Sequence, residues 1–463
     1  MAIEIETSTG EPRPASTPGE SRGSLLRVLG VGFGLAVIIG NTIGAGILRT
    51  PQVVASQLLV VWMFIGVWIV GGLYALLGSF AISELSAMLP RAGGYFVFAR
   101  SAFGEYGGFI VGWTDWMAQC GSTSAVALVI AEYLQGFFPR LLGHEVVVAS
   151  SLAIFFGALQ WRGIKWGSLI QNSTTLAKTL AFVVFVAAAF LLPHAQVAQY
   201  PAQPLATGVG LITAIVIGLQ AVIYSYDGWY GCMYFSEEVR DVKRDIPRSM
   251  IGGVLALMAI YVLVNVALVR MLSLPTIAHE NMAMGTAMQA MFGPRGDTII
   301  RLVMIVSMMS GINAYHLMAS RIPFAMAKNG MLFSGASRVN RGGTPTVSLF
   351  LSVLVAVLFI AGGKIFERVV AIMAFFFVAD YAMAYAAVFV LRWRQPELPR
   401  PYRAWGYPWT TGLALLGSIA FLIGAIFGDR ENSVYAVLVL ALSYPLFLLS
   451  RFLLKRSVNS PGA

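Results

Sequence analysis

Two glycine-rich interruptions of apolar segments contain residue types suited to binding a charged solute. One runs from Gly40 to Ile47 with the sequence GNTIGAGI, and the other from Tyr224 to Trp229 with the sequence YSYDGW. Glycine destabilises a helix by about 1 kcal/mol relative to alanine, so each cluster predicts local unwinding. Inside a membrane, unwound backbone is tolerated only where protein buries it or where it lines a polar cavity. The breaks therefore predict N–H and C=O groups that are free to bind a ligand.

Close packing between helices is the alternative interpretation of the first cluster. Gly40 and Gly44 have the small-xxx-small spacing that brings membrane helices together. We favour a binding site, because Asn41 and Thr42 lie between these two glycines and the later segment has its own break.

Asp227 lies in the second interruption, inside an otherwise apolar segment. A carboxylate at bilayer depth is costly and is by default a functional-site hypothesis. Beside a break, Asp227 is placed to face the side chain or the amine of a solute. The alternative is a carboxylate that only caps free backbone N–H groups. Replacement by Asn affects both roles, but only the first predicts a selective loss of cationic solutes.

The composition is that of a membrane protein. Hydrophobic residues make up 58% of the chain and charged residues 11%, whereas a soluble domain has about 25% charged residues. A spanning helix needs about 20 mostly apolar residues, and the sequence predicts twelve such spans. They begin near Val28, Val60, Gly107, Val146, Leu169, Gly208, Met250, Ile299, Thr346, Val369, Trp409 and Val434.

The net charge of +10 follows the loops rather than forming one patch. With the amino terminus inside, most of the 31 Lys and Arg residues fall on the inner side, which satisfies the positive-inside rule and predicts that both termini are cytoplasmic. A basic patch for RNA or lipid headgroups is the alternative, and we expect no nucleic-acid partner.

The two cysteines, Cys120 and Cys232, lie inside predicted spans, and the four histidines show no zinc-ligand spacing, so we expect no disulfide framework, metal or cofactor.

Both breaks occupy equivalent places in two halves of the chain, in the first and the sixth span. Five spans per half is an odd number, so the halves are expected to be inverted repeats, with spans 11 and 12 appended. The predicted organisation is a disordered cytoplasmic tail (1–24), a transmembrane domain (25–457) with repeats at about 25–193 and 208–393 and helices 11 and 12 at about 408–457, and a second tail (458–463).

Several motifs, in order along nearly the whole chain, resemble the amino acid–polyamine–organocation permease family. They are Gly40–Ile47, Pro90–Tyr95 with Phe103–Gly104, Tyr224–Pro247, Ser320–Gly330, Gly343–Pro345 and Leu391–Pro401. Within that family the segment from Tyr226 to Val239 is most similar to the light-chain (L-type) amino acid transporters and their bacterial relatives. The resemblance implies an all-α membrane protein of the LeuT type, with twelve transmembrane helices, a 5+5 inverted repeat and discontinuous helices 1 and 6. Eukaryotic light chains join a heavy chain through a cysteine between spans 3 and 4; Pro139–Glu145 has none, so no disulfide-linked partner is expected.

The resemblance implies an amino acid as the substrate, and a buried zwitterion needs both of its charges satisfied. The amides of Gly44, Ala45 and Gly46 are expected to bind the carboxylate, because the start of a helix carries a partial positive charge. The family often has Ser at the position of Ala45, so binding here rests on the backbone. The carbonyl groups expected to bind the ammonium are those of Thr42, Ile43, Tyr224 and Ser225.

Further roles also follow from the resemblance. Tyr224 occupies the place of the aromatic residue that closes over substrate, and Trp229 flanks the same break; packing is the alternative for both. Lys178 is expected near the unwound part of span 1, where sodium-coupled relatives hold a cation, and a buried lysine that releases its proton is a coupling hypothesis. Snorkelling toward the inner face is its alternative. Asn313 is expected to line the pocket or to make an interhelical hydrogen bond.

The resulting hypothesis is a permease that moves neutral and cationic amino acids by alternating access, through proton symport or exchange. A polyamine or other organocation permease, in which Asp227 holds an amine, is the first alternative, and a nutrient sensor on the same scaffold is the second. An enzyme is not expected, because paired carboxylates, metal ligands and an activated nucleophile are missing from the sequence. The expected location is a bacterial inner membrane.

Overall fold

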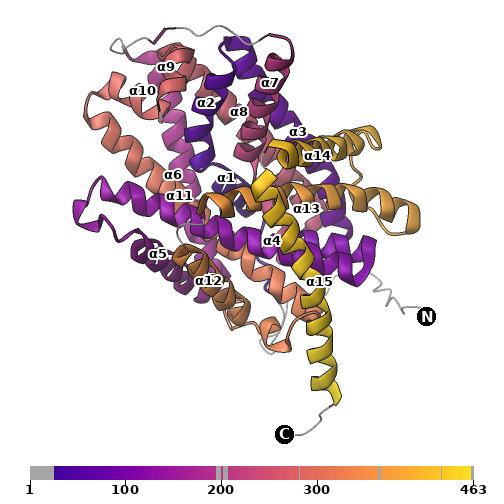
Figure 1. The fold of residues 1–463 in the computed structure, drawn as a ribbon. Helices are drawn as coiled ribbons and strands as arrows, with labels where there is room; N and C mark the ends of the chain where they lie inside the picture. Colours follow the sequence, from indigo (N-terminus) through magenta and orange to yellow (C-terminus); the bar gives the residue numbers. More distant parts are fainter. Residues whose placement is uncertain are drawn as a thin grey trace.

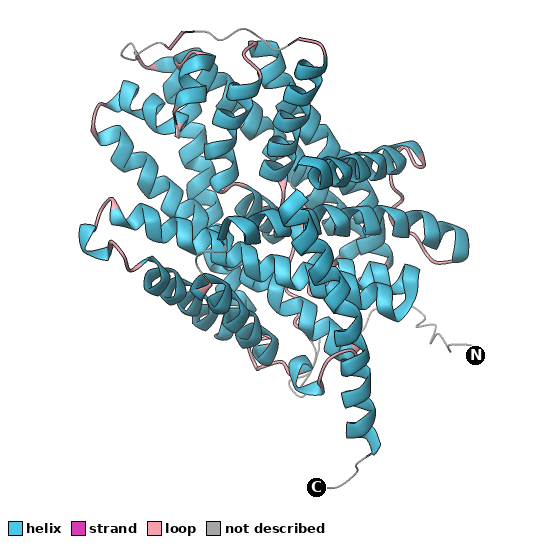
Figure 2. Ribbon diagram, viewed as in Figure 1, coloured by secondary structure: helices cyan, strands magenta, loops and turns pink. Residues whose placement is uncertain are grey.

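The computed structural model describes residues 25–193, 200–201, 207–280, 282–362, 366–428 and 430–459. The predicted tail 1–24 and the last four residues of the chain lie outside this part. The described residues fold as a bundle of helices joined by short loops (Figures 1 and 2).

The first half of the chain forms the helices α1 (Val31–Thr42), α2 (Ala45–Gln57), α3 (Val61–Met88), α4 (Tyr95–Gln135), α5 (Glu145–Trp161) and α6 (Ile164–Leu191), with a short 3₁₀ turn, η1 (Pro139–Leu141). The second half forms α7 (Val209–Tyr226), η2 (Gly231–Phe235), α8 (Val242–Met271), α9 (Leu274–His279), α10 (Ala283–Phe292), α11 (Arg295–Lys328), η3 (Ser334–Ser337), α12 (Thr346–Ala361) and α13 (Phe366–Arg394). The helices α14 (Trp409–Gly428) and α15 (Arg430–Asn459) end the chain.

Eight helices of the described part are long and apolar enough to cross a membrane, and the bent pair α1–α2 makes a ninth candidate. The other three predicted spans coincide with α4, α5 and α12. The last two are apolar but short, at 17 and 16 residues. α4 is long, but its middle carries Asp115 and Gln119, both completely buried, which lower its hydropathy.

Both chain breaks lie at the two glycine clusters. α1 ends at Thr42 and α2 begins at Ala45, with an angle of 47° between the two helices. α7 ends at Tyr226, and Gly228 then has a φ of +102°, a conformation that L side chains rarely adopt. The chain continues as the 3₁₀ turn η2 rather than as a second α-helix.

Two of the three glycines of the first cluster, Gly40 and Gly44, have different surroundings. A Cβ on Gly40 would lie 1.9 Å from Nε2 of Gln171 on α6, so this glycine permits close packing of α1 against α6. A Cβ on Gly44 would meet nothing within 4 Å. The packing interpretation therefore fits Gly40, and the binding interpretation fits Gly44.

Candidate solute-binding site

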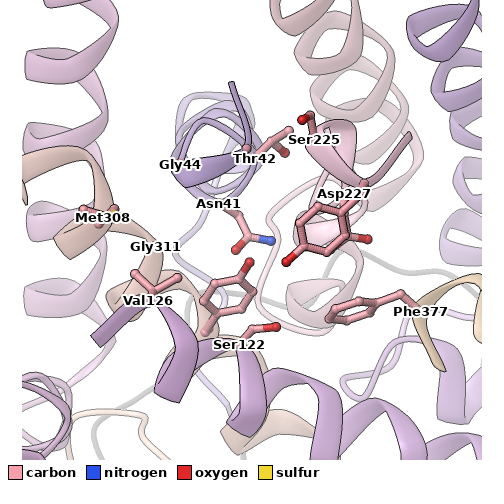
Figure 3. Close-up of a pocket in the computed structure, with 13 residues that line it drawn as sticks. Asn41, Thr42, Gly44, Ser122, Val126, Ser225, Asp227, Met308, Gly311 and Phe377 are labelled. Carbon is pink, nitrogen blue, oxygen red and sulfur yellow. The ribbon is translucent and has the colours of Figure 1, made fainter. Parts of the chain in front are cut away.

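A cavity of about 90 Å³ lies where the two breaks meet (Figure 3). Its walls come from α1, α2, α4, α7, α11 and α13, so helices from both halves of the chain contribute. It is lined by Asn41, Thr42, Gly44, Gly46, Ser122, Val126, Tyr224, Ser225, Asp227, Met308, Gly311, Tyr315 and Phe377.

The first turn of α2 presents uncapped N–H groups next to this cavity. Gly44 is the N-cap residue of α2, and no described side chain caps that end of the helix. The first N–H groups of a helix have no partner within it and carry the positive end of the helix dipole. Gly44 and Gly46 both line the cavity. This wall is therefore suited to an anionic group.

The four carbonyl groups predicted to bind an ammonium already accept hydrogen bonds within the protein. Those of Thr42 and Ser225 accept from the Tyr261 hydroxyl, at 2.9 and 3.0 Å. That of Ile43 accepts from Lys178 Nζ at 2.6 Å, and that of Tyr224 from the Asp227 N–H at 3.1 Å. A carbonyl oxygen has two lone pairs, and that of Ile43 uses both, because it also accepts from Ser307 Oγ at 2.9 Å. The role of these carbonyl groups toward an ammonium stays a prediction.

Two other oxygen atoms at the first break are buried without a partner among the described residues. They are Oδ1 of Asn41 and Oγ1 of Thr42, and both residues line the cavity. The amide nitrogen of Asn41 donates to the Gly228 carbonyl at 3.4 Å, which leaves its oxygen free and ties the two breaks together. Buried polar atoms are nearly always hydrogen-bonded, so these oxygens are suited to a ligand that donates hydrogen bonds.

Asp227 follows the last turn of α7 and lines the same cavity. Its carboxylate accepts hydrogen bonds from the hydroxyl groups of Tyr381 on α13 and Tyr230, the latter at 3.4 Å. These phenols orient the carboxylate, and none of the ion pairs among the described residues involves it. Asp227 is therefore a carboxyl group at a polar cavity with no cationic partner in the described part of the chain.

Lys178 lies behind the first break rather than at a membrane face. Its side chain is 1% exposed, and Nζ donates to the carbonyl oxygens of Gly40 at 2.7 Å, Ile43 at 2.6 Å and Ser307 at 3.3 Å. This contradicts the snorkelling interpretation. The ammonium lies at the carboxyl end of α1, where free carbonyl groups favour a cation.

The other predicted residues are divided between the cavity and the core. Tyr224 is 43% exposed and lines the cavity. Trp229 is buried and packs against the rings of Tyr230 and Tyr381. Asn313 is also buried, and its amide donates to the carbonyl oxygen of Gly167 and to Gln171 on α6. Neither Trp229 nor Asn313 is among the described residues that line the cavity.

Helix geometry explains where Asn313 lies. The residues of α11 that line the cavity are Met308, Gly311 and Tyr315, which share one face at spacings of three and four. Asn313 is two positions from Gly311, about 200° around the helix, and so faces α5 and α6 instead.

Several lining residues on the surrounding helices were not predicted from the sequence: Ser122, Val126, Met308, Gly311, Tyr315 and Phe377. Ser122 and Val126 are four residues apart, and spacings of three and four also relate the lining residues of α11. These helices carry apolar or small side chains on several faces. The spacing of such residues therefore does not identify the face that lines a cavity. Asn41 was noted in the sequence, but its free amide oxygen depends on the contact with Gly228.

Buried ion pairs connect helices and loops on the side of the bundle that is predicted to be cytoplasmic. Arg321 on α11 forms a bidentate pair with Glu238, which follows η2, at 2.9 and 3.0 Å, and both side chains are fully buried. Glu84 on α3 pairs with Arg392 at 2.6 Å and with Arg400 at 3.6 Å. The first pair holds the segment after η2 against α11, and the other two hold the end of α13 and the loop after it against α3.

A family profile described as amino acid permease matches residues 33–448. The chain is 26% identical over 429 residues to the serine/threonine exchanger SteT of Bacillus subtilis (strain 168), covering 91% of this chain and 96% of that protein. It is 25% identical over 405 residues to the large neutral amino acids transporter small subunit 2 of Homo sapiens, covering 84% and 74%. It is 24% identical over 412 residues to the b(0,+)-type amino acid transporter 1 of Homo sapiens, covering 86% and 82%.

Proposed function

The chain belongs to the amino acid permease family, whose members are multi-pass membrane transporters rather than enzymes. We therefore propose that it moves small neutral and cationic amino acids across the membrane by alternating access. We further propose that it works by exchange or by proton symport. Similarity to a serine/threonine exchanger over most of both chains supports exchange.

The observation that carries this proposal is that one cavity is lined both by an uncapped helix start and by a carboxyl group with no cationic partner among the described residues. The N–H groups at Gly44 and Gly46 are placed for the carboxylate of an amino acid. Asp227, with the unpartnered oxygens of Asn41 and Thr42, offers acceptors to an ammonium or a cationic side chain. A zwitterion is stable in a buried site only when both of its charges are satisfied.

The size of the cavity favours small side chains. Its volume is about 90 Å³, and on the same measure one water molecule needs about 10–15 Å³. An amino acid the size of serine, threonine or alanine is the natural occupant. A larger side chain requires Tyr224 or Phe377, which also line the cavity, to move aside.

We propose twelve transmembrane helices in two inverted repeats of five, with α14 and α15 appended. Nine candidate spans together with α4, α5 and α12 account for twelve helices. The breaks at α1–α2 and α7–η2 are five spans apart on this count, as the repeat requires. We also propose a protein without a disulfide-linked heavy chain, because Cys120 and Cys232 are both buried and so are not accessible to a partner's cysteine. A bacterial inner membrane remains the proposed location.

Lys178 is the coupling residue suggested by family resemblance. Its ammonium contacts the two carbonyl groups next to the first break, where a metal cation would otherwise be stabilised. Loss of its proton would remove the charge and one of three N–H donors, which would weaken these contacts and loosen the break. This geometry supports a coupling role for Lys178 within the proposed function.

Counterflow in proteoliposomes tests the proposed function. Vesicles that contain the purified protein are loaded with unlabelled solute and given labelled serine, alanine, leucine, arginine or putrescine. We expect trapping of serine and alanine, and trapping of arginine that depends on Asp227. Uptake of putrescine alone would favour a polyamine permease, in which Asp227 holds an amine. Uptake of none, in vesicles where SteT is active, would overturn both transport proposals and leave a sensor.

A further inference from the structure

A second group of carboxylates lies near the cavity, between α4 and α13. Asp115 on α4 is 0% exposed and Asp380 on α13 is 2% exposed. Asp115 interacts electrostatically with both Asp227 and Asp380. Asp380 accepts a hydrogen bond of 3.1 Å from Thr114, the neighbour of Asp115. Two buried acids therefore lie on facing helices, next to the carboxylate of the cavity.

The hydrogen bonds of this pair are incomplete. Asp115 accepts from Tyr234 at 2.7 and 2.9 Å and from Gln119 at 3.0 Å. Oδ2 of Asp380, Oε1 of Gln119 and the hydroxyl of Tyr95 are buried without a partner among the described residues. An unpartnered carboxylate oxygen at such depth requires an explanation, because burial of a free acceptor is costly.

The groups that face the pair supply no positive charge. Among the described residues, the ionisable groups that interact with Asp115, Asp380 and Asp227 are phenols and one thiol: Tyr95 and Cys120 on α4, Tyr224 on α7, Tyr230 just before η2, Tyr234 on η2, Tyr315 on α11 and Tyr381 on α13. The carboxylates that form ion pairs in the described part of the chain are Glu84, Glu105, Glu132, Glu237 and Glu238.

We propose that Asp115 and Asp380 form a proton-binding site that is coupled to solute binding at Asp227. Two buried carboxylates that repel one another, without a cation, cannot both ionise, so the pair holds a proton. Asp115 receives the phenol and amide donors that stabilise an anion. The proton therefore resides on Asp380, whose Oδ2 has no other partner.

The contacts of α13 and η2 link this site to the cavity. On α13, Asp380 is followed by Tyr381, whose hydroxyl binds the carboxylate of Asp227. Tyr230, the residue before η2, donates to Asp227, and Tyr234 on η2 donates to Asp115. A solute amine that draws Asp227 away from these phenols changes the surroundings of both acids. Movement of either element during transport has the same effect, so proton affinity and solute binding become linked.

A proton fits this site better than a metal ion. Among the described residues, no three His, Cys, Asp or Glu side chains are grouped so as to hold a metal. A hard cation needs about six converging oxygen atoms, whereas a proton needs one carboxylate.

The proposal rests on the proposed transport of amino acids, and the experiment separates the two. Proteoliposomes with a trapped pH-sensitive dye are given serine, with and without an inward proton gradient of one pH unit, in sodium-free buffer and again with added sodium. The measured quantity is gradient-driven uptake divided by counterflow in the same vesicles. For the unmodified protein we expect this ratio to be higher with the proton gradient than without it, by up to about tenfold per proton carried. We also expect the internal pH to change when serine enters.

Asp380→Asn, which mimics the protonated acid, is expected to reduce the ratio to its value without a gradient and to abolish the dye signal. Asp115→Asn is the second variant, with the same expectation, in case the first does not fold. Glu105→Gln, at an exposed position, is the matched control and retains the response. A response that persists in Asp380→Asn, or that disappears only in Lys178→Met, would overturn the proposal. So would stimulation by sodium instead of protons. Counterflow without any gradient response would overturn this site but leave the transport function standing.

Discussion

Nζ of Lys178 lies 2.6 Å from the carbonyl oxygen of Ile43, the C-cap residue that directly follows α1. The same ammonium binds the Gly40 carbonyl one turn earlier. A side chain from the fifth predicted span thus holds the unwound end of the first. The break is therefore fixed by a buried cation, and not only by the glycines within it.

Removal of this cation is expected to loosen the break. Lys178→Met keeps the length of the side chain but leaves the Gly40 carbonyl with only the weak hydrogen bond from Ser310 at 3.4 Å. Loss of a buried partner costs about 1–3 kcal/mol, so the melting temperature of the purified protein should fall and serine counterflow should decrease. Lys165→Met, on the exposed first turn of α6, is the control. An unchanged melting temperature would contradict the structural role of Lys178.

Asp227→Asn should change selectivity as well as rate. Hydrogen bonds to charged groups contribute about 1.5–3 kcal/mol, so arginine counterflow should fall by about tenfold or more relative to alanine counterflow. The ratio of the two rates in proteoliposomes is the measurement. Tyr381→Phe, which removes the phenol that orients Asp227 but keeps the charge, should lower both rates with a smaller effect on their ratio. Equal losses in Asp227→Asn would instead indicate that the carboxylate only caps the backbone.

The two glycines of the first break should respond differently to alanine. In Gly40→Ala the new methyl group overlaps Gln171, and overpacking of this kind costs about 1–3 kcal/mol. Its melting temperature should fall. Gly44→Ala has open space for the methyl group and should fold normally, but the methyl group then occupies the cavity and raises KM for serine. Melting curves and uptake kinetics, measured together, separate the two effects.

The buried pair of Arg321 and Glu238 should be essential as a pair. Replacing one partner, as in Glu238→Gln or Arg321→Met, leaves a buried charge unpaired, and such losses cost about 3–5 kcal/mol. Each single variant should give poor yield and a lower melting temperature. The double variant should recover part of the loss, because neither charge remains. No recovery would mean that packing around these side chains, rather than charge pairing, determines the effect.

Local properties of the sequence allowed the class of protein and both breaks to be predicted. Long apolar segments require helices in a membrane, and clustered glycines disfavour helix wherever they occur. Asp227 was identifiable for the same reason, because a carboxylate in an apolar segment is unusual whatever its partners. The comparisons then confirmed the family.

Contacts between distant segments decided the rest. Neighbouring helices determine which face of α11 lines the cavity, whether Trp229 is buried and which groups bind Asn313. The residue periodicity of an apolar helix does not indicate which helices pack against it. The sequence around Lys178 is compatible both with snorkelling and with binding to the end of α1. Only the packing of α6 against α1 distinguishes these two positions, because a charge buried that deeply is stable only where another segment supplies its hydrogen-bond partners.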